Sequence, residues 1–371
     1  MRSLRVTAVL AAALVAAVLS PEAAGAGMLA RPAPGALAQA HIGGRVEIGR
    51  GTVKYSWPGV YFEGRFRGTG VGIVLDDADN DYDIAIDGAT AATLVTPGRT
   101  THWIKGLAPG THRIRLVKRT ESPWAAGAFG GFVAAPGGAI LPKPHARGRQ
   151  IEFIGDSYTV GYGNTSPTRE CTAAEVNRTT DADHSFGALA ARRLNADYQI
   201  NAFSGRGLVR NYNGGEPGTD YRTYYDRALL NIDGNIWQNP GTWRPQLVVI
   251  GLGINDFSTA LNPGEQWTPE TLITAYRDAY QAFLDKLRAR YGPRTIIVVS
   301  ATYLYNTTIY AETAQQIVQT RNAQGDNRIR YWYYGNEDLD YSGCHWHPSL
   351  HDHQLIADRL NNYIAALPLR W

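Results

Sequence analysis

The chain has 371 residues, 44% of them hydrophobic, and a formal net charge of +3. This length and composition are typical of a soluble globular protein with one large or two ordinary domains, each able to bury a core. Because acidic and basic residues are interspersed, the charge pattern excludes the basic surface that nucleic-acid binding requires, and no nucleic-acid partner is expected.

The first 26 residues have the pattern of an export signal. Arg2 and Arg5 precede an apolar run over residues 6–19, and the small residues Ala24–Ala26 follow as a cleavage site. The run is shorter than the roughly 20 residues that a transmembrane helix needs, which disfavours the alternative of an uncleaved anchor. We therefore predict a signal peptide over residues 1–26 and a secreted, extracellular protein that does not reside in a membrane.

The chain contains two cysteines, Cys171 and Cys344. Export leads to an oxidising compartment, in which a single pair of cysteines indicates one disulfide. The alternative is two separate buried thiols.

Residues 41–135 consist of short apolar segments separated by Gly, Pro, Asp or Asn. Apolar and polar residues alternate in Ile84–Ile86 and in Ile114–Lys118, and no helical period is present. Several short strands with regular turns predict a β-sandwich domain of the jelly-roll type. Residues 136–149, rich in Pro, Gly and basic side chains, form the expected linker. The expected strands cover residues 46–49, 52–57, 60–66, 71–77, 82–88, 101–106 and 112–119.

From residue 150 to the C-terminus, predicted strands alternate with predicted helices. One helix begins near Asp183, a long helix begins at Pro269 with Thr268 as its cap, and a last helix follows Pro348. This alternation predicts an α/β domain over residues 150–371, with a parallel sheet covered by helices on both faces. The expected strands cover residues 151–155, 198–203, 246–251, 294–302 and 329–335.

Polar residues and glycines follow four of these strands. Ser157 follows the first, a turn with Gly205 the second, Asn255 the third and His347 the last. Ligands of parallel sheets lie beyond the carboxyl ends of the strands, so we expect these residues to meet there. Acyl transfer uses such a set, because a serine attacks, a histidine takes its proton, and N–H donors stabilise the tetrahedral oxyanion.

The same positions carry a family resemblance. The chain resembles the SGNH (GDSL-type) hydrolase superfamily at Gly155-Asp156-Ser157, Gly205, Gly253-x-Asn255-Asp256 and His347-Pro348. Within that superfamily, the segments FIGDSYTVGYGN, SGRG and HPS, placed behind a β-sandwich, resemble carbohydrate esterase family two, which is acetyl xylan esterase-like. The motifs cover residues 150–371, and the domain order extends the resemblance over nearly all of the mature chain.

The resemblance implies a flavodoxin-like three-layer fold and a serine esterase that removes O-acetyl groups from plant cell-wall polysaccharide (xylan, mannan or glucomannan). It assigns Ser157 as the nucleophile and His347 as the general base and later acid. The backbone N–H groups of Ser157 and Gly205 and the side chain of Asn255 would form the oxyanion hole. Asp256 is expected to organise neighbouring loops. No metal, nucleotide or organic cofactor is implied, and the expected partner is an acetylated polysaccharide or oligosaccharide; the oligomeric state stays open.

One departure from the family pattern concerns the third member of the catalytic triad. The superfamily usually places an aspartate three residues before the histidine, where this chain has Cys344. Members of the carbohydrate branch can carry it two residues before, where this chain has His345. We therefore predict a Ser-His dyad, in which a backbone carbonyl orients His347 through its far ring nitrogen.

The stretch 344–353 also raises the possibility of a metal site, since it contains one cysteine and four histidines. His351 and His353 are two residues apart, so on a helix they point about 200° from each other. We therefore predict no metal, and a helix-start or packing role for these two histidines. For His345, lining the site and facing solvent are both open.

Trp346 adjoins the predicted base, where it would stack on a sugar or form a wall of the acetyl pocket, with simple packing as the alternative. Tyr158 and Tyr162, in the turn after Ser157, and Tyr212, near the turn with Gly205, invite the same two interpretations. Two other functions remain to be separated from the polysaccharide esterase: a GDSL-type lipase or small-ester hydrolase, and a carbohydrate-binding protein with a decayed catalytic site. The presence of Ser157, Asn255 and His347 argues against the latter.

Overall fold

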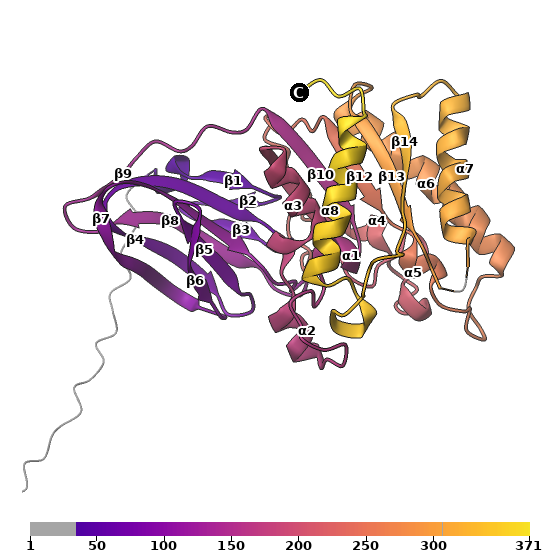
Figure 1. Cartoon of the computed structure of the whole chain (residues 1–371), viewed down its shortest axis with the longest axis horizontal. Helices are drawn as coiled ribbons and strands as arrows, with labels where there is room; N and C mark the ends of the chain where they lie inside the picture. Colours follow the sequence, from indigo (N-terminus) through magenta and orange to yellow (C-terminus); the bar gives the residue numbers. More distant parts are fainter. Residues whose placement is uncertain (1–34, 306) are drawn as a thin grey trace, which may run out of the picture.

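The computed structural model describes residues 35–305 and 307–371. The predicted signal peptide, residues 1–26, lies outside the described residues. Within those ranges, no helix combines the length and the apolar character needed to cross a membrane. Figure 1 shows two sheets, an N-terminal one in indigo and purple, and a second one flanked by helices in magenta to yellow.

The N-terminal sheet is antiparallel and follows the order β2-β3-β8-β4-β7-β5-β6, while β1 and β9 both pair with β4. A short 3-10 helix, Ala36–Gln39, precedes it. The strands are β1 (His41–Gly43), β2 (Glu47–Ile48), β3 (Val53–Tyr55), β4 (Tyr61–Asp77), β5 (Tyr82–Ile86), β6 (Ala89–Leu94), β7 (Gly98–Lys118), β8 (Gly127–Ala134) and β9 (Ala139–Ile140). Strand β9 lies within the predicted linker.

Two long strands replace four of the short strands that the sequence predicts, and the prediction was wrong at these points. β4 joins the expected strands 60–66 and 71–77, and β7 joins those at 101–106 and 112–119. The register of β4 against β7 shifts between Gly68 and Gly70, so these glycines form an irregularity within a continuous strand. A glycine inside an apolar pattern is compatible with either a turn or a bulge, and only strand pairing decides between them.

The second sheet contains five parallel strands in the order β11-β10-β12-β13-β14, which confirms the predicted parallel sheet. Its strands are β10 (Arg149–Gly155), β11 (Ala196–Ala202), β12 (Leu247–Gly251), β13 (Ile296–Thr302) and β14 (Ile329–Tyr334). The helices are α1 (Ser157–Val160), α2 (Ala173–Thr179), α3 (Phe186–Arg193), α4 (Tyr221–Tyr224), α5 (Ile254–Phe257), α6 (Pro269–Tyr291), α7 (Ile309–Ala323) and α8 (Leu350–Ala365). Short 3-10 turns lie at Ala182–His184, Tyr212–Gly214 and Cys344–Trp346.

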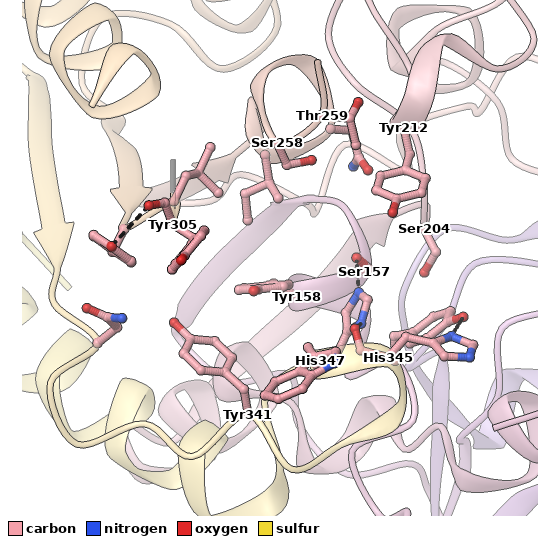
Figure 2. Close-up of a pocket in the computed structure, with 18 residues that line it drawn as sticks. Ser157, Tyr158, Ser204, Tyr212, Ser258, Thr259, Tyr305, Tyr341, His345 and His347 are labelled. Atoms are coloured by element: carbon pink, nitrogen blue, oxygen red, sulfur yellow. Dashed lines mark hydrogen bonds between the residues drawn. The ribbon is translucent and has the colours of Figure 1, made fainter. Parts of the chain in front are cut away.

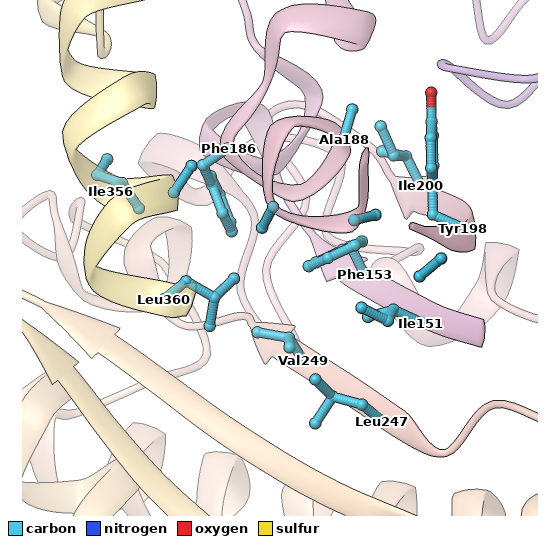
Figure 3. Packing of buried hydrophobic residues seen from close by; sticks show 14 of the residues in the cluster. Ile151, Phe153, Phe186, Ala188, Tyr198, Ile200, Leu247, Val249, Ile356 and Leu360 are labelled. Atoms are coloured by element: carbon cyan, nitrogen blue, oxygen red, sulfur yellow. The ribbon is translucent and has the colours of Figure 1, made fainter. Parts of the chain in front are cut away.

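Helices cover both faces of the parallel sheet. Ile151 and Phe153 of β10 pack with residues of α3 and α8, and Figure 3 shows this cluster. Ile154 belongs to the opposite cluster, with residues of α6 and α7. Because both faces are buried, β10 carries apolar side chains on both sides, and burial of each large one stabilises the fold by about 1.5–3 kcal/mol.

The two sheets also contact each other through buried polar groups. Arg45 forms an ion pair with Glu152 of β10 at 2.8 Å, and neither side chain is exposed. The Tyr61 hydroxyl donates to Asp197 at 2.8 Å. Tyr61 is at the same time part of the apolar cluster under α3 and α8, so the N-terminal sheet contributes to the core of the second domain.

Candidate active site

Ser157 lies where β10 turns into α1. Asp156 caps this helix, since its Oδ1 accepts a hydrogen bond from the Tyr158 N–H at 3.1 Å. Gly155 is required before it, because a Cβ at that position would lie 2.1 Å from Thr159 Oγ1. The turn places Ser157, only 6% exposed, at the first helical position beyond the carboxyl end of the strand.

His347 follows the last 3-10 turn and contacts the serine. Its Nε2 lies 2.8 Å from Ser157 Oγ, as the dashed line in Figure 2 marks. Its Nδ1 lies 3.0 Å from the carbonyl oxygen of Cys344 and 3.2 Å from that of His345. Carbonyl oxygens only accept, so Nδ1 carries the proton and Nε2 is left to accept from the serine hydroxyl.

The imidazole of His347 sits between aromatic rings. The ring of Tyr162 lies 4.3 Å from it between centroids, and that of Tyr158 lies 5.4 Å away. Desolvation lowers the pKa of His347 to about 4, although the two carbonyl acceptors raise it. The ring is therefore neutral near pH 7, as a proton acceptor must be.

Gly205 occupies a turn after β11. The Arg206 N–H donates to the Phe203 carbonyl at 3.3 Å and closes the turn. Gly205 has φ of +76°, and a Cβ there would have open space around it, so this backbone conformation alone favours glycine. Gly205 and Ser157 both line the same cavity.

Asn255 lies in α5, directly after β12, and is buried. Its Nδ2 donates to Asp156 Oδ2 at 3.2 Å and to the Arg206 carbonyl at 3.1 Å, which joins the ends of three strands. Burial raises the pKa of Asp156 to about 7. The next residue, Asp256, organises a loop as expected, because its carboxylate accepts the N–H groups of Leu208, Val209 and Arg210.

The remaining histidines of the stretch have separate partners. His345 lines the cavity, with Nδ1 3.0 Å from the Tyr162 hydroxyl and Nε2 2.8 Å from the Cys171 carbonyl. His353 is buried and its Nδ1 accepts the Phe186 N–H at 3.1 Å, which confirms a packing role. His351 is exposed on the same helix, α8.

Side chains that could bind a metal lie close together at another place, outside the stretch 344–353. Among residues 35–305 and 307–371, the one group of three such side chains is Asp83, Asp181 and His184. Arg119 lies 3.5 Å from Asp83 and 3.4 Å from Asp181, so a guanidinium already balances these carboxylates.

Cys171 and Cys344 form a disulfide, as their number predicts. The bond links the loop before α2 to the loop that carries His347. Because the carbonyl of Cys344 is also the nearer acceptor of His347 Nδ1, the disulfide anchors the residue that orients the imidazole.

Ser157 and His347 open into a cavity of about 1020 Å³. Trp346 is 65% exposed at its rim, with the Arg169 guanidinium 4.0 Å from the ring centroid. Both residues proposed as substrate contacts, Tyr158 and Trp346, line this cavity. The aromatic lining consists of Tyr158, Tyr162, Tyr212, Tyr303, Tyr305, Tyr341 and Trp346 (Figure 2).

Sequence reasoning missed Tyr303, Tyr305 and Tyr341. A signal for the first two was present, because they follow the carboxyl end of β13, where residues of a parallel sheet face the ligand. Tyr341 lies in a long irregular segment after β14, and no local pattern marked it.

Comparisons with known proteins identify the class of this protein. Residues 42–144 match the family model for the carbohydrate esterase 2 N-terminal domain, and residues 151–360 match that for GDSL-like lipase/acylhydrolase. The chain belongs to the GDSL-like lipase/acylhydrolase family, within it to carbohydrate esterase family two, and is a carboxylic ester hydrolase. It combines an SGNH hydrolase domain with a sheet-rich N-terminal domain.

Individual relatives agree with this assignment. The chain is 42% identical over 330 residues to an acetylxylan esterase / glucomannan deacetylase of Cellvibrio japonicus, covering 87% of this chain and 90% of that protein. A solved carbohydrate esterase, whose active site displays divergent catalytic and non-catalytic binding functions, has a TM-score of 0.82 at 40% identity, covering 89% and 98% of the two chains. A family two carbohydrate esterase from Clostridium thermocellum, solved with cellohexaose, has a TM-score of 0.76 at 32% identity, covering 88% and 98%.

Proposed function

We propose that this chain is an exported serine esterase that removes O-acetyl groups from plant cell-wall polysaccharide, namely xylan, mannan or glucomannan. The observation that carries the proposal is the 2.8 Å contact between Ser157 Oγ and a His347 ring whose other nitrogen faces a carbonyl. The substrate class is supported by the name of the Cellvibrio japonicus relative, acetylxylan esterase / glucomannan deacetylase.

In the acylation step, Ser157 Oγ attacks the carbonyl carbon of the acetyl ester and its proton passes to His347 Nε2. The carbonyl oxygen becomes an oxyanion, which the N–H groups of Ser157 and Gly205 and the Asn255 amide stabilise. The bond to the sugar oxygen then breaks, and that oxygen takes the proton from His347. The products are an acetyl-serine and a free sugar hydroxyl.

Deacylation repeats these roles with water as the nucleophile. His347 accepts one proton from the water, whose oxygen attacks the acetyl-serine, and then returns this proton to Ser157 Oγ as acetic acid leaves and ionises to acetate in solution. In the free protein both acceptors of Asn255 Nδ2 belong to the protein, Asp156 and Arg206. The developing oxyanion therefore takes over one N–H of this amide when it forms.

We infer that the catalytic pair works as a dyad. His347 Nδ1 has carbonyl acceptors in the two residues where related enzymes can carry an aspartate. His347→Ala should therefore abolish activity as Ser157→Ala does, whereas His345→Ala should retain a good part of it. If replacing a single Asp or Glu of the chain gave a folded protein as inactive as the Ser157→Ala and His347→Ala variants, a carboxylate would take part in catalysis.

Polysaccharide binding fits the aromatic lining of the cavity. Faces of Tyr and Trp stack on sugar rings while their polar atoms stay hydrated, and Trp346 and Tyr158 are the contacts we propose nearest the reacting ester. The cellohexaose complex of the Clostridium thermocellum relative supports an open site that accepts a glycan chain.

The proposal is tested with a panel of acetylated xylan, acetylated glucomannan and a triglyceride, with acetate or fatty-acid release as the readout. We expect activity on the acetylated glycans and its loss by several powers of ten in Ser157→Ala. Ser342→Ala, outside the cavity, is the matched control and should behave as wild type. Hydrolysis of triglyceride alone would favour the lipase alternative, and an inactive wild type that binds glycan would favour a binding protein.

We also propose the architecture and boundaries that the resemblance implies. These are a signal peptide over residues 1–26, a jelly-roll domain over 41–135 and a flavodoxin-like three-layer domain over 150–371. The strand order β11-β10-β12-β13-β14 and the helices on both faces support the last assignment.

A further inference from the structure

The backbone N–H groups of the turn that carries Gly205 donate to different acceptors. The Phe203 N–H donates to the Gly155 carbonyl at 3.0 Å, and the Arg206 N–H closes the turn. The Ser204 N–H donates to Glu121 Oε1 at 2.8 Å. Among the described residues, the Gly205 N–H is the amide of this turn without an acceptor, so it remains available to a ligand in the cavity.

Glu121 comes from the other domain, in the loop between β7 and β8. Its own carbonyl accepts from Asn177 Nδ2 at 3.1 Å, which ties the loop to α2. Two residues earlier, the Arg119 carbonyl accepts the Ala182 N–H at 2.9 Å. The loop is therefore held by the catalytic domain at α2 and at the 3-10 turn that follows it, and the carboxylate reaches Ser204 from a fixed backbone.

The surroundings of Glu121 make the loss of this hydrogen bond unfavourable. Its side chain is partly buried, and burial raises the pKa of its carboxyl, while hydrogen bonding to Ser204 and, to a lesser extent, the charges of Lys118 and Arg206 oppose that effect. A partly buried N–H that lost its acceptor would be unfavourable, so without Glu121 the backbone at Ser204 would reorient toward another acceptor. The Ser204 N–H lies in the Phe203–Ser204 peptide and the Gly205 N–H in the next one. Because the two planar units are joined at the Ser204 Cα, a rotation of the first unit displaces the second, and with it the Gly205 N–H.

We propose that Glu121 is a positioning residue for the oxyanion hole. It fixes the Phe203–Ser204 peptide, and through it the adjoining Ser204–Gly205 peptide, so that the Gly205 N–H faces the reacting carbonyl oxygen. The catalytic centre then spans both domains, and the N-terminal domain contributes to the rate of the reaction. This inference rests on the proposed serine-esterase function. Figure 2 shows Ser204 on the same side of the cavity as Ser157.

The test compares Glu121→Ala with Glu121→Gln in the full-length protein, on a chromogenic acetate ester. Loss of one oxyanion donor lowers kcat by about 10²–10³-fold, so a misplaced donor in Glu121→Ala should lower kcat by about 10- to 100-fold. KM should change by less than about threefold, since the affected interaction strengthens only in the transition state. Glu121→Gln should stay within about threefold of wild type, because its amide oxygen accepts the same bond.

A second readout is the affinity for a boronic acid, which mimics the tetrahedral oxyanion. It should fall in Glu121→Ala by the same factor as kcat and stay unchanged in Glu121→Gln. Glu47→Ala is the matched control, because Glu47 accepts from Asn235 across the same domain contact and away from the turn. If Glu121→Ala does not fold, Glu121→Asp keeps the charge but withdraws the oxygen by one methylene, and a loss of kcat is expected there too.

The outcomes separate this inference from the proposed function. Wild-type kcat in folded Glu121→Ala or Glu121→Asp, with Ser157→Ala inactive, would overturn the positioning role and leave the esterase mechanism in place. An equal loss in Glu121→Gln and Glu121→Ala would overturn it as well, because hydrogen-bond geometry would not be the cause. Activity in Ser157→Ala would instead remove the proposed function itself.

Discussion

His347 is oriented by peptide carbonyls, with Nδ1 3.0 Å from Cys344 O. A carbonyl selects the tautomer and the ring plane, but it would supply no full negative charge to the imidazolium of the proposed mechanism. In the proposed mechanism, the N–H donors around the oxyanion would therefore carry more of the transition-state stabilisation. A neighbouring carboxylate would also raise the pKa of the ring, whereas here desolvation dominates and the pKa falls to about 4.

The first prediction concerns the pH dependence of catalysis. His347 must be neutral to accept a proton, and its pKa is lowered from the usual 6.5 to about 4. The acid limb of kcat/KM should therefore rise through about pH 4 and be level above about pH 6. We would measure kcat/KM on a chromogenic acetate ester, with samples returned to neutral pH as a control for acid unfolding. A limb centred near the usual histidine value would contradict this.

At the scale of secondary-structure elements, α8 and the loop before it are each tied to another part of the catalytic domain, α8 by a hydrogen bond and the loop by the disulfide. His353 of α8 accepts the N–H of Phe186, the first residue of α3, whose own N-cap Ser185 makes no side-chain capping bond. The first N–H groups of a helix have no partner within it, so this histidine caps α3 from a neighbouring helix. The disulfide then fixes the loop that precedes α8.

The second prediction is that His353→Ala destabilises the protein by about 2–3 kcal/mol, through a cavity and an unpaired buried N–H. His351→Ala, on the exposed side of the same helix, should change the free energy of unfolding by less than about 0.5 kcal/mol. Urea unfolding of both variants checks this difference. Equal stabilities would contradict the capping role.

The third prediction concerns Cys171 and Cys344. Removing the disulfide should lower the free energy of unfolding by about 2–4 kcal/mol. It should also lower kcat, because the Cys344 carbonyl would lose its anchor. The double variant Cys171→Ser, Cys344→Ser is compared with wild type in denaturant and in the esterase assay.

A control accompanies the disulfide variant. Reductant should reproduce the effect in wild type and leave the double variant unchanged. Thiol titration of the denatured, unreduced protein should find no free thiols, and the finding of two would refute the bond.

For the whole molecule, the contact between the two domains contains buried charge. The Arg45 guanidinium lies 4.4 Å from the Tyr225 ring centroid and 4.8 Å from that of Trp237, and it pairs with Glu152. Burying one partner alone is strongly unfavourable, so the pair forms only when both domains are folded and in contact. The two domains are therefore expected to unfold as one cooperative unit.

The fourth prediction is that Arg45→Met lowers the free energy of unfolding by about 3–5 kcal/mol, because Glu152 loses its buried partner. Arg193→Met removes an exposed ion pair with Asp358 and should cost at most about 1 kcal/mol. Differential scanning calorimetry of wild type should show a single transition. Arg45→Met as stable as wild type would argue against a coupled interface.

The sequence by itself determined the order of the elements, the parallel sheet and the residues that follow its strands. These features depend on local periodicity and on short motifs, which is why Ser157 and His347 were found although 190 residues separate them. Tertiary structure alone decided that β4 and β7 are continuous, because a glycine does not distinguish a bulge from a turn without its pairing partner. It also decided which carbonyls face His347, and that a carboxylate of the N-terminal domain, 83 residues before Ser204, reaches the turn of Gly205. The physical reason is that these contacts depend on how two separately formed sheets pack together, and no local pattern of residues specifies that packing.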